Sequence, residues 1–303
     1  MSALEPRSFF ELESTKIARV AIFISGSGTN AEKILEDWQR NQSFHSYKPV
    51  CIVTDRPERC RAEEIATAFE LDFIALDIFS YYSERGLRTT SLATEEGRKI
   101  REEWTATLYE KLEDYRIDFG VFAGFIPLCN ITDHFPCLNV HPGDLTVCDE
   151  NGERILVGLH TLPVHLAIQN DFETMRSSVI VACAYEEEGS GMDEGHIIGI
   201  SPEVEINWLG KDRQYFLQLY NSRPSEKPEG GWRDEYQDFL EKNQEKLKVH
   251  GDWVVFPKAV ADFSKGFFAY QKENLFYKSR EKWLPIEVIE YSSAGKEIFL
   301  KSF

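Results

Sequence analysis

The chain has 303 residues, and its 51 acidic side chains against 34 basic ones give it a formal net charge of −17 at neutral pH. Hydrophobic residues make up 42% and charged residues 28%, which are proportions of a globular protein and not of a disordered or membrane one. A strongly acidic surface repels phosphate backbones, so we do not expect a nucleic-acid partner.

The cysteines and the start of the chain indicate a reduced, cytoplasmic setting. The six cysteines are dispersed and form no C-x-x-C pair, so we expect neither a metal site nor a redox site. No secretory leader opens the sequence, and the apolar run over 17–24 is too short to span a bilayer. We therefore expect a cytoplasmic protein without a membrane partner.

Strand-like and helix-like segments alternate up to residue 141, after a polar N-terminal extension over 1–16. Residues 18–25 (ARVAIFIS) are a nearly continuous apolar run, as expected of a strand buried on both faces. The alternation predicts an α/β fold with a doubly wound, mostly parallel sheet, which binds ligands at the carboxyl ends of its strands. The predicted strands are 18–25, 49–54, 73–76, 119–123 and 137–141, and the predicted helices are 31–40, 62–70 and 94–114.

The second half of the chain has a different pattern. Residues 177–185 and 196–206 are predicted to be longer strands that pair antiparallel at the edge of the sheet. Residues 210–250 form a polar insert with an exposed turn and a solvated helix. Nothing here requires a second domain, so we expect one domain over 17–303. The remaining predicted elements are a helix over 253–263 and short terminal strands over 267–277 and 283–299.

The first motif that can carry chemistry is the turn Gly26-Ser27-Gly28-Thr29-Asn30, between a predicted strand and a predicted helix. Its glycines allow a close approach to a ligand, and the helix N-terminus offers free N–H groups, so the turn suits a phosphate. The same letters also satisfy the dinucleotide fingerprint G-x-G-x-x-A, with Asp55 where a ribose-binding acid would lie. A purely structural turn is the third interpretation.

The second motif, Asn139-Val140-His141-Pro142, ends a predicted strand. Residues two apart in a strand point to the same face, so Asn139 and His141 project together. An amide donor beside an imidazole suits attack on a carbonyl, because the amide stabilises an oxyanion and the imidazole transfers protons. The alternative is a hydrogen-bonded histidine without a catalytic role.

The third motif is the acidic turn over 191–198 (GMDEGHII), in which Asp193 could orient an imidazole and raise its pKa. Acid and glycine residues also make ordinary turns, and that explanation stays open.

Taken in order, ISGSGTN, AGFIPL, LNVHP, GLHT and MDEGHII resemble the folate-dependent formyltransferases, most closely the glycinamide ribonucleotide formyltransferases. The resemblance covers about residues 17–201 and resumes over 252–284. It implies a formyltransferase-like variant of the Rossmann fold. It also implies transfer of a formyl group from 10-formyltetrahydrofolate to the primary amine of glycinamide ribonucleotide in purine biosynthesis. We expect a monomer or homodimer.

The resemblance also implies a role for particular residues. Without it, Arg101 can be read as a solvated helix charge and Asp252 as the N-cap of a helix. The implied catalytic residues are Asn139, His141 and Asp193; the implied substrate-binding residues are Gly28, Thr29, Asn30 and Asp252; and the implied folate-binding residues are Arg101, Ile126, Pro127, Leu128, Cys129 and Asn139.

In the implied mechanism the amine attacks the formyl carbon directly, so no nucleophilic serine or cysteine is needed. Asn139 and a protonated His141 stabilise the oxyanion, and Asp193 keeps the imidazole protonated.

The sequence departs from the family pattern in several segments. The loop over 143–158 is longer and acidic, the segment 184–190 is inserted, and Ile180 replaces an imidazole of the preceding strand. The insert over 210–250 and the residues after 286 have no counterpart that we can name. These departures affect the identity of the acceptor more than the class of reaction.

Several rival functions remain open. A formyltransferase for a sugar nucleotide or for methionyl-tRNA would share the three catalytic residues, although the acidic total argues against tRNA. A formyltetrahydrofolate hydrolase would use water in place of the amine. An NAD-dependent oxidoreductase or an inactive folate-binding protein are the alternatives from other classes.

Overall fold

Five parallel strands form one half of the central sheet in the computed structural model, which describes residues 5–11, 17–41, 46–185 and 191–301. The near-continuous apolar runs of the two central ones, 18–24 and 119–122, fit burial on both faces. All five were predicted from the sequence, each within two residues of its observed bounds, and the α/β class with a mostly parallel sheet is confirmed. In spatial order they are β4 (Asp72–Ala75), β3 (Tyr47–Thr54), β2 (Ala18–Ile24), β5 (Phe119–Phe122) and β6 (Cys137–His141).

The other half of the sheet is mixed. β8 (Ser178–Val181) pairs antiparallel with β6, and β9 (Ile197–Ile200) pairs antiparallel with β8, which confirms the predicted pairing. Their predicted place at the sheet edge is wrong, because the eleven-residue β13 (Lys282–Ser292) lies beside β9. The sheet then continues through β12 (Asn274–Ser279), β11 (Phe268–Gln271) and β1 (Arg7–Ser8), while β14 (Gly295–Leu300) pairs with β13.

The segment predicted as one long strand over 196–206 is divided. β9 ends at Ile200, and Pro202, which cannot donate to a strand ladder, separates it from β10 (Val204–Glu205). β10 pairs with β7 (Thr174–Met175) in a separate two-stranded sheet.

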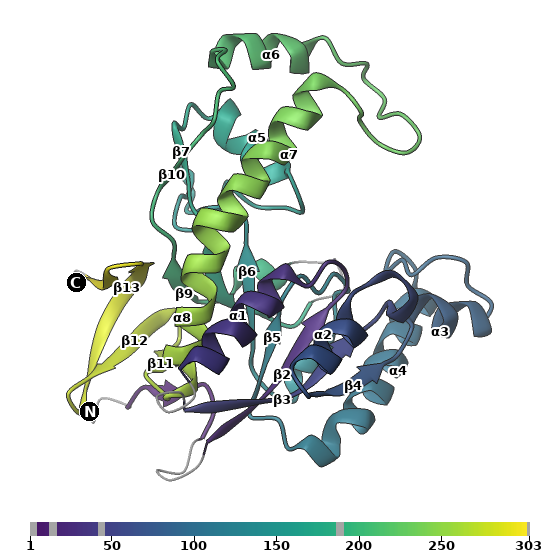
Figure 1. Ribbon diagram of the computed structural model, residues 1–303, viewed down its shortest axis with the longest axis vertical. Coiled ribbons are helices and arrows are strands. Elements are labelled where there is room, and N and C mark those ends of the chain that lie inside the picture. The colour runs from purple at the N-terminus through teal and green to yellow at the C-terminus, as the bar shows by residue number, and fades with distance from the viewer. Residues whose placement is uncertain (1–4, 12–16, 42–45, 186–190, 302–303) are drawn as a thin grey trace.

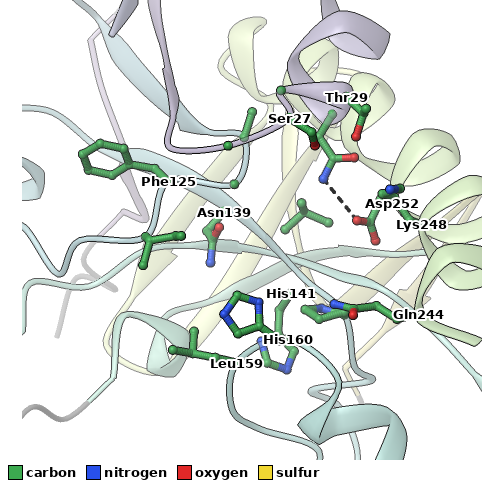
Figure 2. A pocket seen from close by; sticks show the side chains of 18 of the residues that line it. Ser27, Thr29, Phe125, Asn139, His141, Leu159, His160, Gln244, Lys248 and Asp252 are labelled. Carbon is green, nitrogen blue, oxygen red and sulfur yellow. Dashed lines mark hydrogen bonds between the residues drawn. The ribbon is translucent and has the colours of Figure 1, made fainter. Parts of the chain in front are cut away.

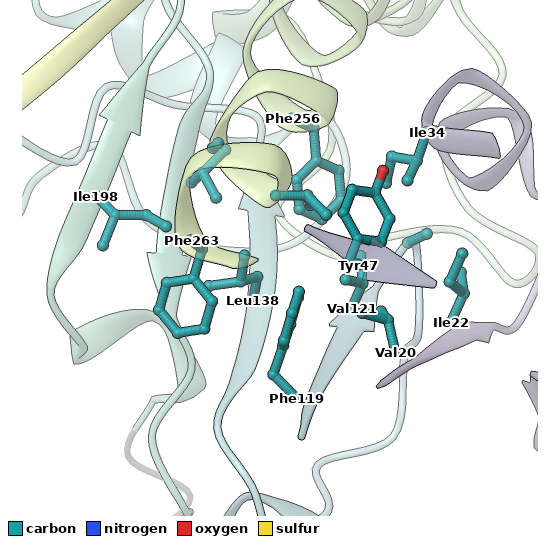
Figure 3. Packing of buried hydrophobic residues seen from close by; sticks show 14 of the residues in the cluster. Val20, Ile22, Ile34, Tyr47, Phe119, Val121, Leu138, Ile198, Phe256 and Phe263 are labelled. Carbon is teal, nitrogen blue, oxygen red and sulfur yellow. The ribbon is translucent and has the colours of Figure 1, made fainter. Parts of the chain in front are cut away.

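Helices cover both faces of the sheet (Figure 1). Alternate residues of β2 enter different cores: Val20 and Ile22 pack with α1, α2 and α8, whereas Phe23 packs with α3 and α4. Figure 3 shows the first core, in which Phe256 and Phe263 of α8 lie over the strands. The helices are α1 (Thr29–Arg40), α2 (Ala62–Ala68), α3 (Ile78–Glu84), α4 (Glu95–Leu112) and α8 (Trp253–Ser264).

The polar insert folds into a lobe that stands above the sheet (Figure 1). It contains α6 (Arg213–Asn221) and α7 (Glu235–Leu247), which pack with α5 (Leu162–Gln169) around a third apolar cluster. The prediction of a solvated helix was wrong for α7, because one of its faces buries Phe239 against Phe216, with ring centroids 3.6 Å apart. We call α5, α6, α7, β7 and β10 the insert lobe.

One rod of helix joins the insert lobe to the core. α7 continues through a π-helical segment, Lys248–Asp252, directly into α8. π-helical turns inside α-helices occur frequently at functional sites, which makes this segment a place to look for ligand-binding residues. No helix in the described part of the chain is long and apolar enough to cross a membrane.

Candidate active site

A cavity of about 720 Å³ lies at the carboxyl ends of the parallel strands, where this class of sheet binds ligands. Its walls come from the turn after β2, the loop after β5, the end of β6 and the residues that join α7 to α8. The lining includes Gly28, Thr29, Asn30, Ile126, Leu128, Asn139, His141, Asp193 and Asp252 from the predicted site.

Three of these side chains, which are far apart in the sequence, meet in the cavity. Asn139 Nδ2 donates to Asp193 Oδ1 over 3.3 Å, and His141 Nδ1 lies 3.3 Å from Asp193 Oδ2. Figure 2 shows the Asn139 amide directed toward the His141 ring. The strand period places Asn139 and His141 on one face, and the turn before β9 brings Asp193 to them.

Both nitrogens of the His141 ring face acceptors. Nε2 lies 2.8 Å from the Leu156 carbonyl oxygen, and Nδ1 faces the Asp193 carboxylate. Neither acceptor carries a proton of its own, so both contacts are hydrogen bonds only when the ring is an imidazolium. The ring itself is only 2% exposed.

Arg154 holds the segment that carries Asp193. Its Nη2 donates to the Gly195 carbonyl over 2.8 Å, and its Nη1 donates to the carbonyl of Asp193. Arg154 belongs to the long acidic loop over 143–158, and no local pattern in the sequence connected it with Asp193.

The glycine turn after β2 has the geometry of an anion site. Gly28 has φ +66°, a left-handed conformation, and a Cβ there would overlap the Ile65 side chain. Gly28 has no side chain with which to cap α1, so the first N–H groups of that helix face the cavity with the positive end of the helix dipole. Lys248, which also pairs with Glu245, lines the same cavity.

Asp252 ends the π-helical segment directly before α8, but it has helical backbone angles and its side chain makes no capping hydrogen bond to that helix, so it does not act as the N-cap that the alternative expected. Its carboxylate accepts from Asn30 Nδ2 over 3.1 Å (Figure 2) and from Ser177 Oγ over 2.6 Å. Burial raises the pKa of the Asp252 carboxyl above its ordinary value, and the bonds from Ser177 and Asn30 only partly oppose this. The side chain remains part of the cavity lining.

Arg101 is buried and not a solvated helix charge, so that alternative is wrong as well. Its guanidinium donates to the carbonyls of Leu128 and Thr90, over 2.6 and 2.7 Å, and to the Tyr82 hydroxyl over 3.2 Å. Arg101 lines a smaller cavity of about 300 Å³ on the other side of the 126–128 loop. It thereby positions the backbone of this loop.

Three further residues considered from the sequence, Pro127, Cys129 and Asp55, do not line the larger cavity. Pro127 lines the smaller cavity only, and Cys129 is fully buried, with its Sγ 3.6 Å from Thr105 Oγ1. Burial raises the pKa of the Cys129 thiol to about 11. Asp55 is fully buried and accepts from the Ser25 hydroxyl, so its carboxylate does not reach the cavity at Gly28 as a ribose-binding acid would.

The cavity also includes residues that the sequence interpretation did not single out. Leu159 and His160 line the cavity from a tight turn, in which Gly158 has φ +109° and His160 has φ +56°. The motif GLHT had marked this turn without giving it a role. The polar insert contributes Glu241, Gln244, Glu245 and Lys248, spaced to share one face of a helix.

Of the inserted segment 184–190, residues 186–190 lie outside the described residues. Tyr185 is held at its start, where its backbone N–H donates to Asn130 Oδ1 over 2.9 Å and its hydroxyl donates to Glu102. In the described part of the chain, no group of three or more histidine, cysteine, aspartate or glutamate side chains is placed to hold a metal ion.

Solved structures share this architecture at low sequence identity. A glycinamide ribonucleotide transformylase from Symbiobacterium toebii aligns with TM-score 0.57 and 20% identity, over 88% of this chain and 96% of its own. A phosphoribosylglycinamide formyltransferase from Coxiella burnetii aligns with TM-score 0.55 and 16% identity, over 89% and 96%. A formyltetrahydrofolate deformylase from Pseudomonas syringae gives TM-score 0.57 and 11% identity, over 88% and 68%.

No protein-family model and no curated protein sequence matches the chain. The structural matches nevertheless agree with the resemblance seen in the sequence motifs, and they confirm it at the level of the fold. The chain has the α/β fold of the phosphoribosylglycinamide formyltransferases.

Proposed function

We propose that this protein transfers the formyl group of 10-formyltetrahydrofolate to the primary amine of glycinamide ribonucleotide. The observation that carries the proposal is the convergence of Asn139, His141 and Asp193 beside the Gly28 turn in one cavity. A volume of about 720 Å³ lies within the range of small-molecule sites, which is roughly 300–1,000 Å³. The shared fold with formyltransferases supports the same class of reaction.

The proposed chemistry uses the side-chain donors of β6. The amine nitrogen forms a bond to the formyl carbon, and the carbonyl electron pair moves to oxygen. Asn139 Nδ2 and the imidazolium of His141 donate hydrogen bonds to this oxyanion. The contact of 3.3 Å between His141 Nδ1 and Asp193 is longer than a charge-assisted bond of about 2.7–2.9 Å, whereas Nε2 lies 2.8 Å from the Leu156 carbonyl, so Nδ1 is the ring nitrogen proposed to donate to substrate.

Collapse of the adduct then breaks the bond between the formyl carbon and N10 of the folate. His141 donates a proton to N10, and the proton lost by the amine restores the imidazolium, so the net change is one proton moved from amine to N10. Asp193 stabilises the charged ring throughout and never becomes the nucleophile.

The two substrates would use opposite walls of the cavity. The phosphate of the acceptor would bind the N–H groups at Gly28, Thr29 and Asn30, with Asp252 toward the ribose hydroxyls. The folate would lie against Ile126, Leu128 and Asn139, on the loop that Arg101 supports.

A second candidate function is hydrolysis of 10-formyltetrahydrofolate, with water in place of the amine. The structural match to a formyltetrahydrofolate deformylase, with TM-score 0.57, supports hydrolysis as this second candidate. The two functions share the three residues and differ only in the nucleophile.

The deciding experiment follows release of tetrahydrofolate by absorbance, with and without glycinamide ribonucleotide. Release only in the presence of the amine supports the transferase, and equal release with water alone supports the hydrolase. No release under either condition would reject both.

Asp193→Asn tests the site itself. The variant keeps the shape but loses the charge that holds the His141 imidazolium, so we expect turnover to fall about a hundredfold or more. Glu194→Gln is the matched control, because its carboxylate is the neighbouring exposed one and should leave turnover unchanged. Circular dichroism checks that both variants are folded, and normal turnover in folded Asp193→Asn would contradict the assignment.

A further inference from the structure

A second cavity of about 930 Å³ opens in the insert lobe, next to the candidate active site. The two cavities share four lining residues: Leu159, His160, Glu241 and Gln244. All four belong to α7 or to the 159–160 turn. The second cavity therefore adjoins the candidate active site at the wall that these two elements form, and not at the 123–128 loop. We call it the distal cavity.

The walls of the distal cavity combine aromatic and basic side chains. Tyr220 and Trp232 line it together with Arg223 and Lys227, and among the described lining residues Glu241 carries the one carboxylate. Asp234, which does not line the cavity, pairs with Arg223, so Lys227 is the cation that this wall presents to a ligand. Such a wall favours a planar aromatic ligand that carries negative charge.

The aromatic wall is held rigidly. The Arg223 guanidinium lies between the rings of Trp232 and Tyr236, at 4.6 and 4.8 Å from their centroids. It also donates two hydrogen bonds to Asp234, over 2.8 and 2.6 Å, and its side chain is only 9% exposed. Arg223 therefore fixes the loop that presents Trp232, and a preformed surface loses little entropy when a ligand stacks on it.

A histidine adds a polar contact to this wall. His165 Nδ1 lies 2.7 Å from the Tyr236 hydroxyl. Burial, and then the nearby charge of Arg223, lower the pKa of His165, so the ring is neutral at physiological pH. A neutral ring whose one nitrogen is engaged still offers the other to a ligand.

We propose that the distal cavity is a binding site for a nucleoside phosphate, with the base against Trp232 and Tyr220 and the phosphate near Lys227. Base stacking on an aromatic ring tolerates any base, because each base has a π-face. Binding at this site does not depend on the proposed formyl transfer. The nucleoside phosphate can be part of the amine acceptor or a separate ligand, and the chemistry that recognises it is the same.

Isothermal titration calorimetry on the full chain tests the site, with AMP and UMP as probes and inorganic phosphate as the anion alone. We expect saturable binding of a nucleotide, weakened about tenfold by Trp232→Ala and by Lys227→Glu. Lys242→Glu is the matched control, since Lys242 is an exposed cation of α7 outside both cavities, and binding should be unchanged.

The Gly28 turn is the competing site for a phosphate, and Gly28→Ala separates the two. Nucleotide binding that survives Gly28→Ala and is lost in Trp232→Ala supports the distal cavity. Binding that shows the reverse pattern, or that inorganic phosphate reproduces at equal affinity, would overturn the proposal. So would the absence of saturable nucleotide binding.

A kinetic measurement then identifies the source of the nucleotide. If free nucleotide raises the KM for glycinamide ribonucleotide and leaves kcat unchanged, the distal cavity is an extension of the acceptor site. If free nucleotide changes kcat, it binds there as a separate ligand. A chain that binds nucleotide through Trp232 but never deformylates the folate would support the distal site and reject the proposed function.

Discussion

The Asp193 carboxylate contacts both polar side chains that β6 contributes to the candidate site, Asn139 and His141. One oxygen accepts from the Asn139 amide and the other faces the His141 ring, so a single carboxylate orients both donors of β6. Arg154 in turn holds the backbone on which Asp193 sits. The proposed reaction therefore depends on the acidic loop over 143–158, which supplies both Arg154 and the Leu156 carbonyl that contacts His141.

Asp252 is the residue at which stability and binding are expected to conflict. Its folded pKa lies above the unfolded value of about 3.9, so the folded state retains a proton that the unfolded state has released as the pH rises. Stability attributable to Asp252 is thus lost between pH 4 and its folded pKa, and it remains lost at neutral pH. Asp252→Asn removes this dependence.

We expect Asp252→Asn to be more stable than the native chain at pH 7, and the difference to shrink toward pH 4. The new amide can accept from Ser177 and donate to Asn30 Oδ1, which is buried and has no hydrogen-bond partner among the described residues. The KM for the acceptor should rise roughly tenfold or more, because a charged acceptor for its hydroxyls is gone. Urea denaturation at several pH values and steady-state kinetics measure the two effects.

Asp262→Asn is the control for this prediction. Asp262 is also buried, but its carboxylate pairs with Lys296 at 2.5 Å and Lys265 at 3.5 Å. Removing that charge leaves the cations unpaired and should lower stability at neutral pH. A loss of stability in Asp252→Asn as large as that in Asp262→Asn would refute the analysis of Asp252.

The sequence alone predicted those site residues that lie in local patterns. Asn139 and His141 share a strand face, and Gly28 ends a strand before a helix, so spacing was enough. Arg154 was missed because its partner lies about 40 residues away and its bonds are to backbone carbonyls, which no side-chain motif records. The bonds of Arg101 to the carbonyls of Leu128 and Thr90 escape local patterns for the same reason.

At the scale of elements, the turn from β2 into α1 depends on one glycine. Gly28→Ala places a side chain in a left-handed conformation and against Ile65, so we expect a loss of about 1–3 kcal/mol in unfolding free energy. The same change displaces the N–H groups of α1, so the KM for the phosphorylated acceptor should also rise. Urea denaturation and kinetics with glycinamide ribonucleotide report the two effects.

Gly26→Ala is the matched control two residues earlier. A Cβ at Gly26 meets nothing within 4 Å, and its φ lies outside the left-handed region. Equal losses of stability in the two variants would show that the turn tolerates side chains equally, and that Gly28 has no special role.

The elements that were predicted well are those with strong local signals. The central strands β2 and β5 are buried on both faces and show it as nearly continuous apolar runs. β13 was expected to be part of a short terminal pair, because its position beside β9 depends on contacts between segments some 90 residues apart. Similarly, the buried face of α7 was not predicted, because the apolar residues that cover it come from α5, α6 and the β7–β10 pair, which are distant in the sequence.

At the scale of the whole molecule, the insert lobe and the sheet are two packed units joined through one helical rod. The lobe has its own apolar cluster, while α8 at the other end of the rod belongs to the cluster on the sheet. Between them, the segment from Glu241 to Asp252 lines the candidate site. The wall of the cavity that this segment forms therefore depends on the folding of the lobe.

Phe239→Ala tests this dependence. Phe239 is fully buried and stacks on Phe216, so its truncation should cost about 3–5 kcal/mol, concentrated in the lobe. Hydrogen exchange should then accelerate in α5, α6 and the first turns of α7 but not in β2, β5 and β6. The KM for the acceptor should rise, because α7 no longer holds Glu241 and Gln244 in place.

Tyr215→Phe is the control for this prediction. It removes only an exposed hydroxyl bonded to Glu235, so its unfolding free energy should stay within about 0.5 kcal/mol of that of the native chain. Uniform acceleration of exchange across lobe and sheet would show that the two fold as one cooperative unit, and unchanged kinetics in Phe239→Ala would separate the lobe from the site.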